Sequence, residues 1–255
     1  MINFFSLLLA ALFLISPIKV LATTTSNEEL NWYYSFDKNL NTLLSPREAP
    51  FLSDEIAIFK GNESQKVLYL TFDEGYENGF TPSIIDTLNK NNVTAAFFVT
   101  KPYITSQPEL IKKMYDGNHL VCNHTAKHKS MPTLVGTENF TKEFKEVEVE
   151  YTKITGDKMP IFFRPPMGKY SHKSLLETKK LGYISVFWSF AYKDWLTDQQ
   201  PTPEYAFNKI TSNIHNGQIL LLHACSKTNA TILDSLIKHL KSEGYEFRSL
   251  NDFNK

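Results

Sequence analysis

Residues 67–75 read VLYLTFDEG, and this stretch decides the fold. An apolar run that ends abruptly in charged residues and a glycine is typical of a β-strand that enters a turn. Gly75 fits a tight turn, and the residues at 81–90 follow with a helical pattern. The stretch therefore predicts a strand, a turn and a helix, with the carboxylates of Asp73 and Glu74 at the C-terminal end of the strand.

The same alternation of strand and helix continues to the C-terminus. Apolar runs predict strands at 67–72, 95–100, 119–122, 162–164, 184–190, 219–223 and 247–250. Amphipathic patterns predict helices at 81–90, 107–116, 137–155, 174–181, 203–215 and 229–243. Alternating strands and helices imply parallel strands with crossover helices, and the continuous run at 219–222 implies burial on both faces. The predicted fold class is α/β, either a barrel or an open sheet.

The N-terminal part divides into two segments. Residues 4–15 are apolar apart from Ser6, Pro17 ends the run, and small or apolar residues precede Thr23. This pattern predicts a signal peptide at 1–22 and export, with an uncleaved anchor reaching Ile18 as the alternative. Residues 23–65 show no clean periodicity and predict an N-terminal extension that wraps the domain formed by 66–255.

Composition excludes several classes of protein. Of the 255 residues, 42% are hydrophobic, 13% aromatic and 21% charged, which excludes a disordered chain, a collagen-like repeat or a small disulfide scaffold. Lys+Arg and Asp+Glu both number 27, so no basic footprint of a nucleic-acid binder exists. Cys122 and Cys225 are too few for a disulfide framework. We expect both to be small buried hydrophobic residues, with a mutual disulfide as the alternative.

Polar side chains follow five of the predicted strands. They are Asp73-Glu74-Gly75, Asn123-His124, Arg164-Pro165-Pro166, Asp194-Trp195 and His223. In parallel α/β proteins, functional sites are assembled at the C-terminal ends of the strands. We therefore expect these segments to converge on one pocket.

The spacing of His124 and His128 indicates a metal site. Residues four apart share one face of a helical turn, the spacing used when two histidines bind one divalent metal, with an idle surface pair as the alternative. Asp73 or Glu74 supplies a carboxylate from another strand end. Two histidines and one carboxylate leave coordination positions open, as in a catalytic site. Since adjacent strand residues point to opposite faces, one carboxylate is expected on the metal and the other as a base, or one as a helix cap.

Two further residues need partners. Arg164 is costly to bury unless it is paired, and Asp73 is the expected partner, although a solvent-exposed arginine is the alternative. The prolines at 165–166 stiffen the backbone, and the N–H groups of Met167 and Gly168 are candidates to face an oxyanion. His223 is either a hydrogen-bonded core residue or an acid that Asp194 orients and tunes.

The motifs together resemble a known family. They are Thr71-Phe72-Asp73-Glu74-Gly75, His124-Thr125-Ala126-Lys127-His128, Arg164-Pro165-Pro166, Asp194-Trp195 and Leu221-Leu222-His223, and they resemble the five ordered motifs of the NodB-homology polysaccharide deacetylases, carbohydrate esterase family 4. The resemblance spans about residues 66–250. It implies a distorted (β/α) barrel and metal-dependent removal of acetyl groups from N-acetylated amino sugars.

The resemblance also implies residue roles. Asp73 resembles the catalytic base, Arg164 its partner, His223 the general acid and Asp194 the residue that tunes it. His124 and His128 resemble the metal ligands, and Trp195 and Leu221 resemble the walls of the substrate pocket. Met167 is expected to contact the substrate through its backbone N–H. Most members carry Asp where this chain has Glu74, whose longer carboxylate can still reach a divalent ion as a third ligand. The expected metal is zinc, with cobalt, manganese and magnesium as alternatives.

A narrower resemblance concerns the substrate. Residues 74–82, 186–189 and 223–226 resemble the delta-lactam-biosynthetic de-N-acetylases of spore cortex. This implies an enzyme that acts on N-acetylmuramic acid in peptide-stripped glycan strands of peptidoglycan, before muramic delta-lactam forms. We expect a monomer, and no protein partner is implied. The expected location is the cell wall or the space between the forespore membranes. The alternatives are an N-acetylglucosamine deacetylase of peptidoglycan or chitin, a glycosidase using Asp73 and Asp194, and a wall-binding module with a decayed site.

Overall fold

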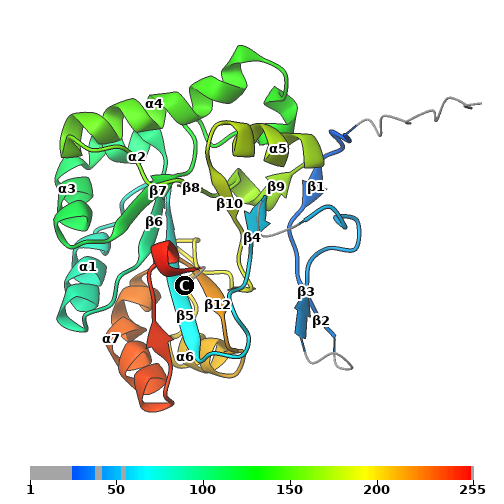
Figure 1. Ribbon diagram of the computed structural model, residues 1–255. Coiled ribbons are helices and arrows are strands. Elements are labelled where there is room, and N and C mark those ends of the chain that lie inside the picture. The colour runs from blue at the N-terminus through cyan, green and yellow to red at the C-terminus, as the bar shows by residue number, and fades with distance from the viewer. Residues whose placement is uncertain (1–24, 38–41, 53–55, 254–255) are drawn as a thin grey trace, which may run out of the picture.

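The computed structural model describes residues 25–37, 42–52 and 56–253 (Figure 1). The predicted signal peptide at 1–22 lies outside the described residues. Within them, no helix has both the length and the apolar character needed to cross a membrane. Cys122 and Cys225 are both buried and free, as expected of small core residues.

A parallel sheet forms the centre of the molecule. In spatial order its strands are β11 (Phe190–Ala191), β12 (Gln218–His223), β5 (Val67–Glu74), β6 (Ala96–Val99), β7 (Leu120–Asn123), β8 (Phe162–Phe163), β10 (Ile184–Val186) and β4 (Ala57–Ile58), and β13 (Glu246–Phe247) also pairs with β5. The pairing of β12 with β5 sets His223 beside Asp73. With its surrounding helices the sheet forms a half-barrel (Figure 1), which confirms the predicted α/β class and distorted barrel.

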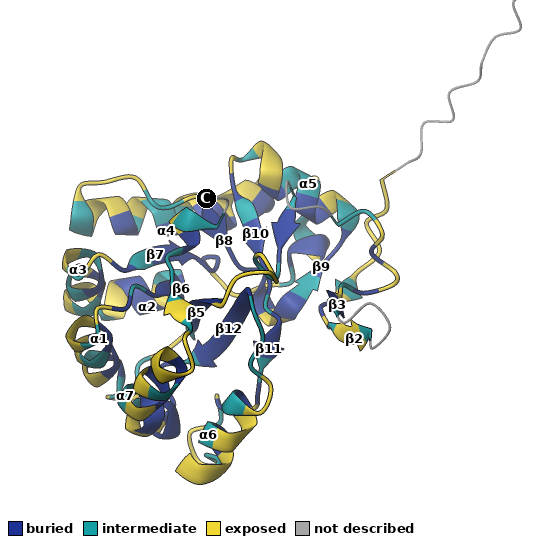
Figure 2. Ribbon diagram, turned by 60° about the horizontal axis from the view of Figure 1, so that its bottom comes forward, coloured by how far each residue is buried: buried dark blue, intermediate teal, exposed yellow. Residues whose placement is uncertain are grey.

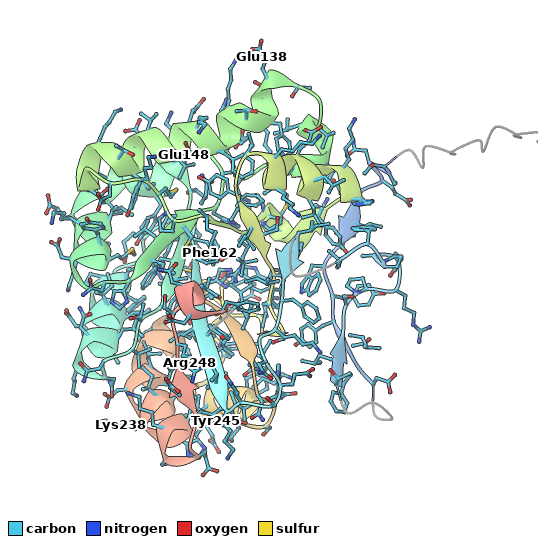
Figure 3. All side chains as sticks on the ribbon, in the orientation of Figure 1. Glu138, Glu148, Phe162, Lys238, Tyr245 and Arg248 are labelled. Carbon is cyan, nitrogen blue, oxygen red and sulfur yellow. The ribbon has the colours of Figure 1, made fainter. Side chains whose placement is uncertain are left out.

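Helices cover the outer face of the sheet. They are α1 (Thr81–Lys90), α2 (Lys101–Ser106), α3 (Pro108–Asp116), α4 (Glu138–Thr155), α5 (His172–Lys180), α6 (Pro203–Thr211) and α7 (Lys227–Ser242), with short 3-10 turns at Met131–Leu134, Pro166–Gly168 and Leu250–Asp252. Their apolar sides pack on the strands, so in Figure 2 strand β12 is dark blue whereas the outer surface of α6 is largely yellow. Figure 3 shows the same division, with Glu138 pointing outward from the start of α4 and Phe162 lying inside.

Strand β5 has two different faces. Leu70 and Phe72 belong to the core cluster that contains Ile84 and Ile85 of α1. Tyr69 belongs instead to the cluster inside the half-barrel, together with Phe98 and Ile219. Because side chains alternate along a strand, Asp73 follows Tyr69 toward the inside and Glu74 follows Phe72 toward the helices.

Some predicted elements need correction. The strand predicted at 184–190 is two strands, β10 and β11, because the chain between them leaves the sheet and offers the carbonyl groups of Val186 and Phe187 to Arg164. The strand predicted at 247–250 is β13 followed by a 3-10 turn, and the helix predicted at 203–215 ends at Thr211. Helix α2 was not predicted, since six residues are too few to show helical periodicity.

The N-terminal extension contributes to the fold. Strand β1 (Leu30–Asn31) pairs with β9 (Lys169–Tyr170), β2 (Ser35–Asp37) pairs with β3 (Thr42–Leu44), and β4 joins the main sheet. Trp32 is buried and stacks on Phe187 with ring centroids 4.3 Å apart. Its backbone N–H donates to the carbonyl of Gly168 at 2.8 Å, and its indole N–H donates to the carbonyl of Trp188 at 2.9 Å. The extension thus supports the loop at 166–170, which borders the site described below.

Candidate active site

A cavity of about 870 Å³ lies at the edge of the sheet where the C-terminal ends of the strands meet. The predicted site residues that line it are Asp73, His124, His128, Met167, Trp195, Leu221 and His223. Arg164 and Asp194 are buried just behind two of these side chains. Segments that are far apart in the sequence therefore meet at one place, as the strand-end pattern predicts.

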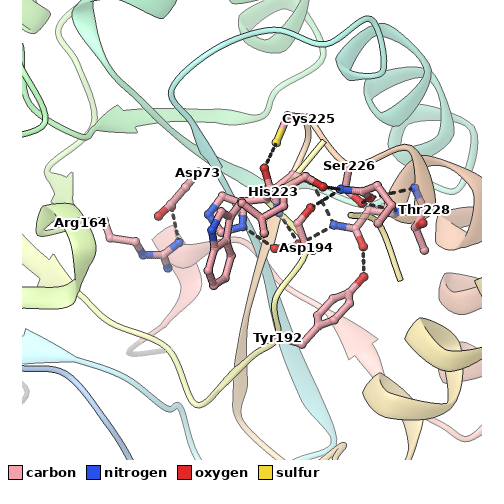
Figure 4. A network of polar contacts seen from close by, with 12 residues as sticks. Asp73, Arg164, Tyr192, Asp194, His223, Cys225, Ser226 and Thr228 are labelled. Atoms are coloured by element: carbon pink, nitrogen blue, oxygen red, sulfur yellow. Dashed lines mark hydrogen bonds and ion pairs between the residues drawn. The ribbon is translucent and has the colours of Figure 1, made fainter. Parts of the chain in front are cut away.

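Asp73 and Arg164 form a buried ion pair. The Nη1 atom of Arg164 donates to Oδ1 of Asp73 at 2.8 Å (Figure 4), while Nε and Nη2 donate to the carbonyl groups of Val186 and Phe187. The guanidinium is fully buried and lies 4.1 Å from the ring centroid of Phe98. Burial by itself raises the pKa of Asp73, but the positive charges nearby, that of Arg164 first, together with the hydrogen bond from Arg164 outweigh burial, and the pKa is lowered overall. Asp73 is therefore ionised at neutral pH.

His124 and His128 both line the cavity and pack edge to face, with ring centroids 4.9 Å apart. The pair is not on a helical turn, which corrects the prediction. The chain forms a tight turn in which Thr125 and His128 have φ of 72° and 52°. The N–H of Thr125 donates to the side chain of Asn123, and the N–H of His128 donates to the hydroxyl of Thr125. These bonds, rather than helical geometry, hold the imidazoles together.

The protonation of His124 is fixed by its surroundings. Nδ1 lies 2.8 Å from the carbonyl oxygen of Arg164, which accepts hydrogen bonds only, so Nδ1 carries the hydrogen. Burial lowers the pKa of His124 to about 4, so the ring is neutral and Nε2 bears a lone pair. Nε2 lies 3.6 Å from Oδ2 of Asp73. Desolvation also lowers the pKa of His128.

These features fit a divalent cation. A metal-binding histidine is neutral and usually donates its other N–H to a carbonyl or carboxylate, as His124 does. Among the described residues, however, no group of three or more His, Cys, Asp or Glu side chains has the arrangement of a metal site. The side chains that would hold a divalent ion here are therefore the two imidazoles, and its remaining coordination positions would be left for water and substrate.

Glu74 is not brought to the histidine pair. Its side chain is 1% exposed and does not line the cavity, and neither carboxylate oxygen has a hydrogen-bond partner among the described residues. Burial, followed by the nearby charges of Glu77 and Asp73, raises the pKa of Glu74 well above its ordinary value. The predicted division of the two carboxylates between opposite faces is correct, but the second one faces the helices instead of the predicted metal.

His223 and Asp194 form the other charged pair of the site (Figure 4). Nδ1 of His223 lies 2.7 Å from Oδ1 of Asp194, and the backbone N–H of His223 donates to Oδ2 at 2.9 Å. Burial alone lowers the pKa of His223, but the charge and hydrogen bond of Asp194 outweigh it and raise the pKa overall. The imidazolium is therefore stabilised, with Leu221 and Trp195 lining the cavity beside it.

Sequence reasoning missed Asn229. Its side-chain amide donates to Oδ2 of Asp194 at 2.6 Å and to the carbonyl of His223 at 3.1 Å, and its oxygen accepts from the hydroxyl of Tyr192. Asn229, in the first turn of α7, thus holds Asp194 and His223 in place through these hydrogen bonds. The only available signal is a polar residue on the buried side of a helix, which does not by itself indicate a partner.

The predicted oxyanion donors differ in availability. The N–H of Gly168 donates to the carbonyl of Pro165 at 3.1 Å and is therefore occupied. Met167 has φ of 59°, an uncommon conformation for a residue with a side chain. Trp32 and the strand pair β1–β9 hold this loop from the outside. Of the two groups, Met167 remains the candidate.

Comparisons with known proteins agree with this geometry. The profile of the family described as "Polysaccharide deacetylase" matches residues 60–186. The peptidoglycan-N-acetylmuramic acid deacetylase PdaA of Bacillus subtilis is 40% identical over 240 residues, which cover 91% of this chain and 88% of that protein. The peptidoglycan-N-acetylglucosamine deacetylase PgdA of Listeria monocytogenes is 30% identical over 74% of this chain and 39% of that protein.

Solved structures give the same result. The structure of Bacillus subtilis PdaA, titled a family 4 carbohydrate esterase, superposes with a TM-score of 0.84 at 40% identity and covers 89% of this chain and 97% of that one. A family 4 carbohydrate esterase from Bacillus anthracis superposes with a TM-score of 0.74 at 37% identity, covering 90% and 97%. Together with the motifs gathered in the cavity, these similarities show that the chain belongs to the polysaccharide deacetylase family, carbohydrate esterase family 4.

Proposed function

We propose that this enzyme removes the acetyl group from N-acetylmuramic acid residues of peptidoglycan. The observation that carries the proposal is that an ionised Asp73 and a stabilised imidazolium at His223 lie side by side in the lining of one cavity. Hydrolysis of an amide needs such an arrangement, because water must lose a proton and the departing amine must gain one. The choice of sugar rests on the similarity to PdaA, whose name states that activity.

In this mechanism Asp73 takes the proton from the attacking water, and Arg164 keeps the carboxylate ionised and oriented. The oxygen of water bonds to the acetamide carbon, and the N–H of Met167 faces the resulting oxyanion. His223 then donates its proton to the nitrogen as the C–N bond breaks, which releases acetate and a free amine. Asp194 holds His223 in the orientation and charge state that this step requires.

Members of the family are generally metal-dependent deacetylases. His124 and His128 would hold a divalent ion here, which would supply positive charge near the carbonyl oxygen and lower the pKa of a bound water. Zinc is the metal that we propose, with cobalt, manganese and magnesium as alternatives.

The biological setting follows from the substrate. Peptidoglycan lies outside the cytoplasm, which agrees with a signal peptide at 1–22, an extension at 23–65 and a deacetylase domain at 66–255. We propose that the enzyme acts as an exported monomer on glycan strands, in the cell wall or between the forespore membranes. Deacetylated muramic acid carries the free amine from which the delta-lactam of spore cortex can form.

Mass spectrometry of defined peptidoglycan fragments tests this proposal. After incubation with enzyme and metal, we expect muramic acid residues to lose the mass of an acetyl group while glucosamine residues keep theirs. Loss from glucosamine alone would support the N-acetylglucosamine deacetylase instead. Cleavage of the glycan chain without release of acetate would support the glycosidase, although Asp194 is 1% exposed and bound to His223 and Asn229.

The position of Glu74 gives one reason to test the wall-binding module as well. A protein that binds the fragments but releases no acetate with any of the four metals would fit that reading. Acetate release with any one of them would exclude it.

A further inference from the structure

The proposed substrate differs from N-acetylglucosamine by one charged group. Muramic acid carries a lactyl ether on the carbon next to the acetamide-bearing carbon, and its carboxylate is free when no stem peptide is attached. A stem peptide converts this carboxylate into a neutral amide. A cation beside the reacting acetamide would therefore let an enzyme select peptide-free muramic acid.

Lys193 lines the same cavity as Asp73 and His223. Exposure alternates along 191–195, with Tyr192 and Asp194 buried while Lys193 and Trp195 are exposed. Tyr192 bonds to Asn229 and Asp194 bonds to His223, so the backbone on both sides of Lys193 is fixed. Lys193 and Trp195 both line the cavity, and the Trp195 ring lies 5.5 Å from the His223 ring. Lys193 therefore lies on the same side of this segment as Trp195, the residue whose ring is next to His223.

The charges of the cavity favour an anion at this position. The only carboxylate among its described lining residues is Asp73, which Arg164 neutralises. Lys127 also lines the cavity, but its backbone N–H donates to Glu143, and its charge adds to that of Lys101, which mainly lowers the pKa of Glu146. Lys193 forms no ion pair with any carboxylate in the described parts of the chain. Its ammonium group is therefore free to bind a substrate anion.

We propose that Lys193 binds the lactyl carboxylate of peptide-free muramic acid and thereby determines the specificity of the enzyme. This inference rests on the proposed function. The ammonium group recognises a charge that glucosamine lacks and that a stem peptide removes. Trp195 packs on the sugar ring next to Lys193, so the same segment contacts both the sugar ring and its lactyl substituent.

The test compares two fragments that differ only in this charge. One is a peptide-free glycan fragment with free lactyl carboxylates, and the other is the same fragment with the lactyl groups amidated. The kcat/KM for acetate release from each gives a ratio for the wild type, Lys193→Ala, Lys193→Arg and Lys127→Ala. Lys127→Ala is the matched control, because it removes the same charge from the same cavity rim.

We expect the wild type to prefer the free acid by about tenfold or more, mainly through KM, and Lys193→Ala to reduce this ratio to near one. Lys193→Arg should restore the preference, and Lys127→Ala should keep it. The inference is overturned if Lys193→Ala keeps the wild-type ratio, or if Lys127→Ala removes it equally. A wild type that deacetylates muramic acid without preferring the free acid overturns the inference alone, whereas one that releases acetate only from glucosamine also overturns the proposed function.

Discussion

Asp73 and His223 lie next to each other in the pairing of β5 with β12, yet their partners hold them in opposite charge states. Arg164 lowers the pKa of Asp73 against the effect of burial, and Asp194 raises the pKa of His223 against the same effect. A base that is ionised and an acid that is protonated can therefore coexist over a range of pH.

The motifs predicted both pairs because each charged residue needed a buried partner, but they did not predict Asn229 or the direction of Glu74.

Replacement of Asp194 should lower the pH at which activity is lost on the alkaline side of the profile. The proton on His223 is held by Asp194, so Asp194→Asn lowers the pKa of His223 and the acid is lost at a lower pH. We expect kcat to fall about 10²-fold or more and the alkaline limb of the kcat profile to move to lower pH. An unchanged alkaline limb in a folded variant would show that His223 is not the acid.

Replacement of Glu74 should stabilise the protein at high pH. The folded-state pKa of Glu74 is raised, so folding keeps the carboxyl neutral while the unfolded chain ionises, and stability falls as pH rises above the ordinary value. Glu74→Gln removes this penalty. We expect its Tm to exceed that of the wild type by roughly 2–8 °C at pH 8 and to match it at pH 4.

The same variant tests whether Glu74 binds the metal. Because its carboxylate lies on the helix side of β5, calorimetry should give equal zinc affinities for the wild type and Glu74→Gln. His124→Ala is the comparison variant and should weaken zinc binding strongly. Equal weakening by both changes would contradict the position of Glu74 described above.

At the scale of elements, length decided which predictions succeeded. Helix α1 occupies the predicted residues 81–90, and α4 begins one residue after its predicted start, because both present several turns of regular periodicity. The two-residue strands β1 and β4 carry no periodicity, so the extension could be predicted only as a wrapping segment. The break between β10 and β11 could not be predicted either, because an apolar run of sequence does not indicate that its carbonyl groups accept hydrogen bonds from an arginine.

The contact of the extension with the loop at 166–170 leads to a further prediction. Trp32→Ala removes a buried ring and the indole bond to Trp188, which should reduce the free energy of unfolding by about 3 kcal/mol. We expect kcat to fall as well, because the backbone bond between Trp32 and Gly168 helps to hold Met167. Tyr33→Ala is the control, since Tyr33 is 43% exposed and should cost little. Equal losses in both variants would argue against this role of Trp32.

At the scale of the whole molecule, the fold explains why distant motifs form one site. Parallel strands place their C-terminal ends at one edge, so residues of β5 and β12 meet there with residues that directly follow β7 and β8. This rule let the sequence predict the class of fold and the pocket. It could not predict the turn that joins His124 to His128, nor the direction of Lys193, because both depend on bonds formed only after the chain folds.

The central claim is that Asp73 activates water to release acetate from muramic acid. The most direct test measures acetate release from peptide-free glycan strands by the wild type, by Asp73→Asn, and by Asp234→Asn, which makes the same change outside the cavity lining. We predict that Asp73→Asn lowers kcat about 10³-fold in a folded protein, while Asp234→Asn stays near the wild-type rate. Near wild-type release of acetate by folded Asp73→Asn would contradict the account.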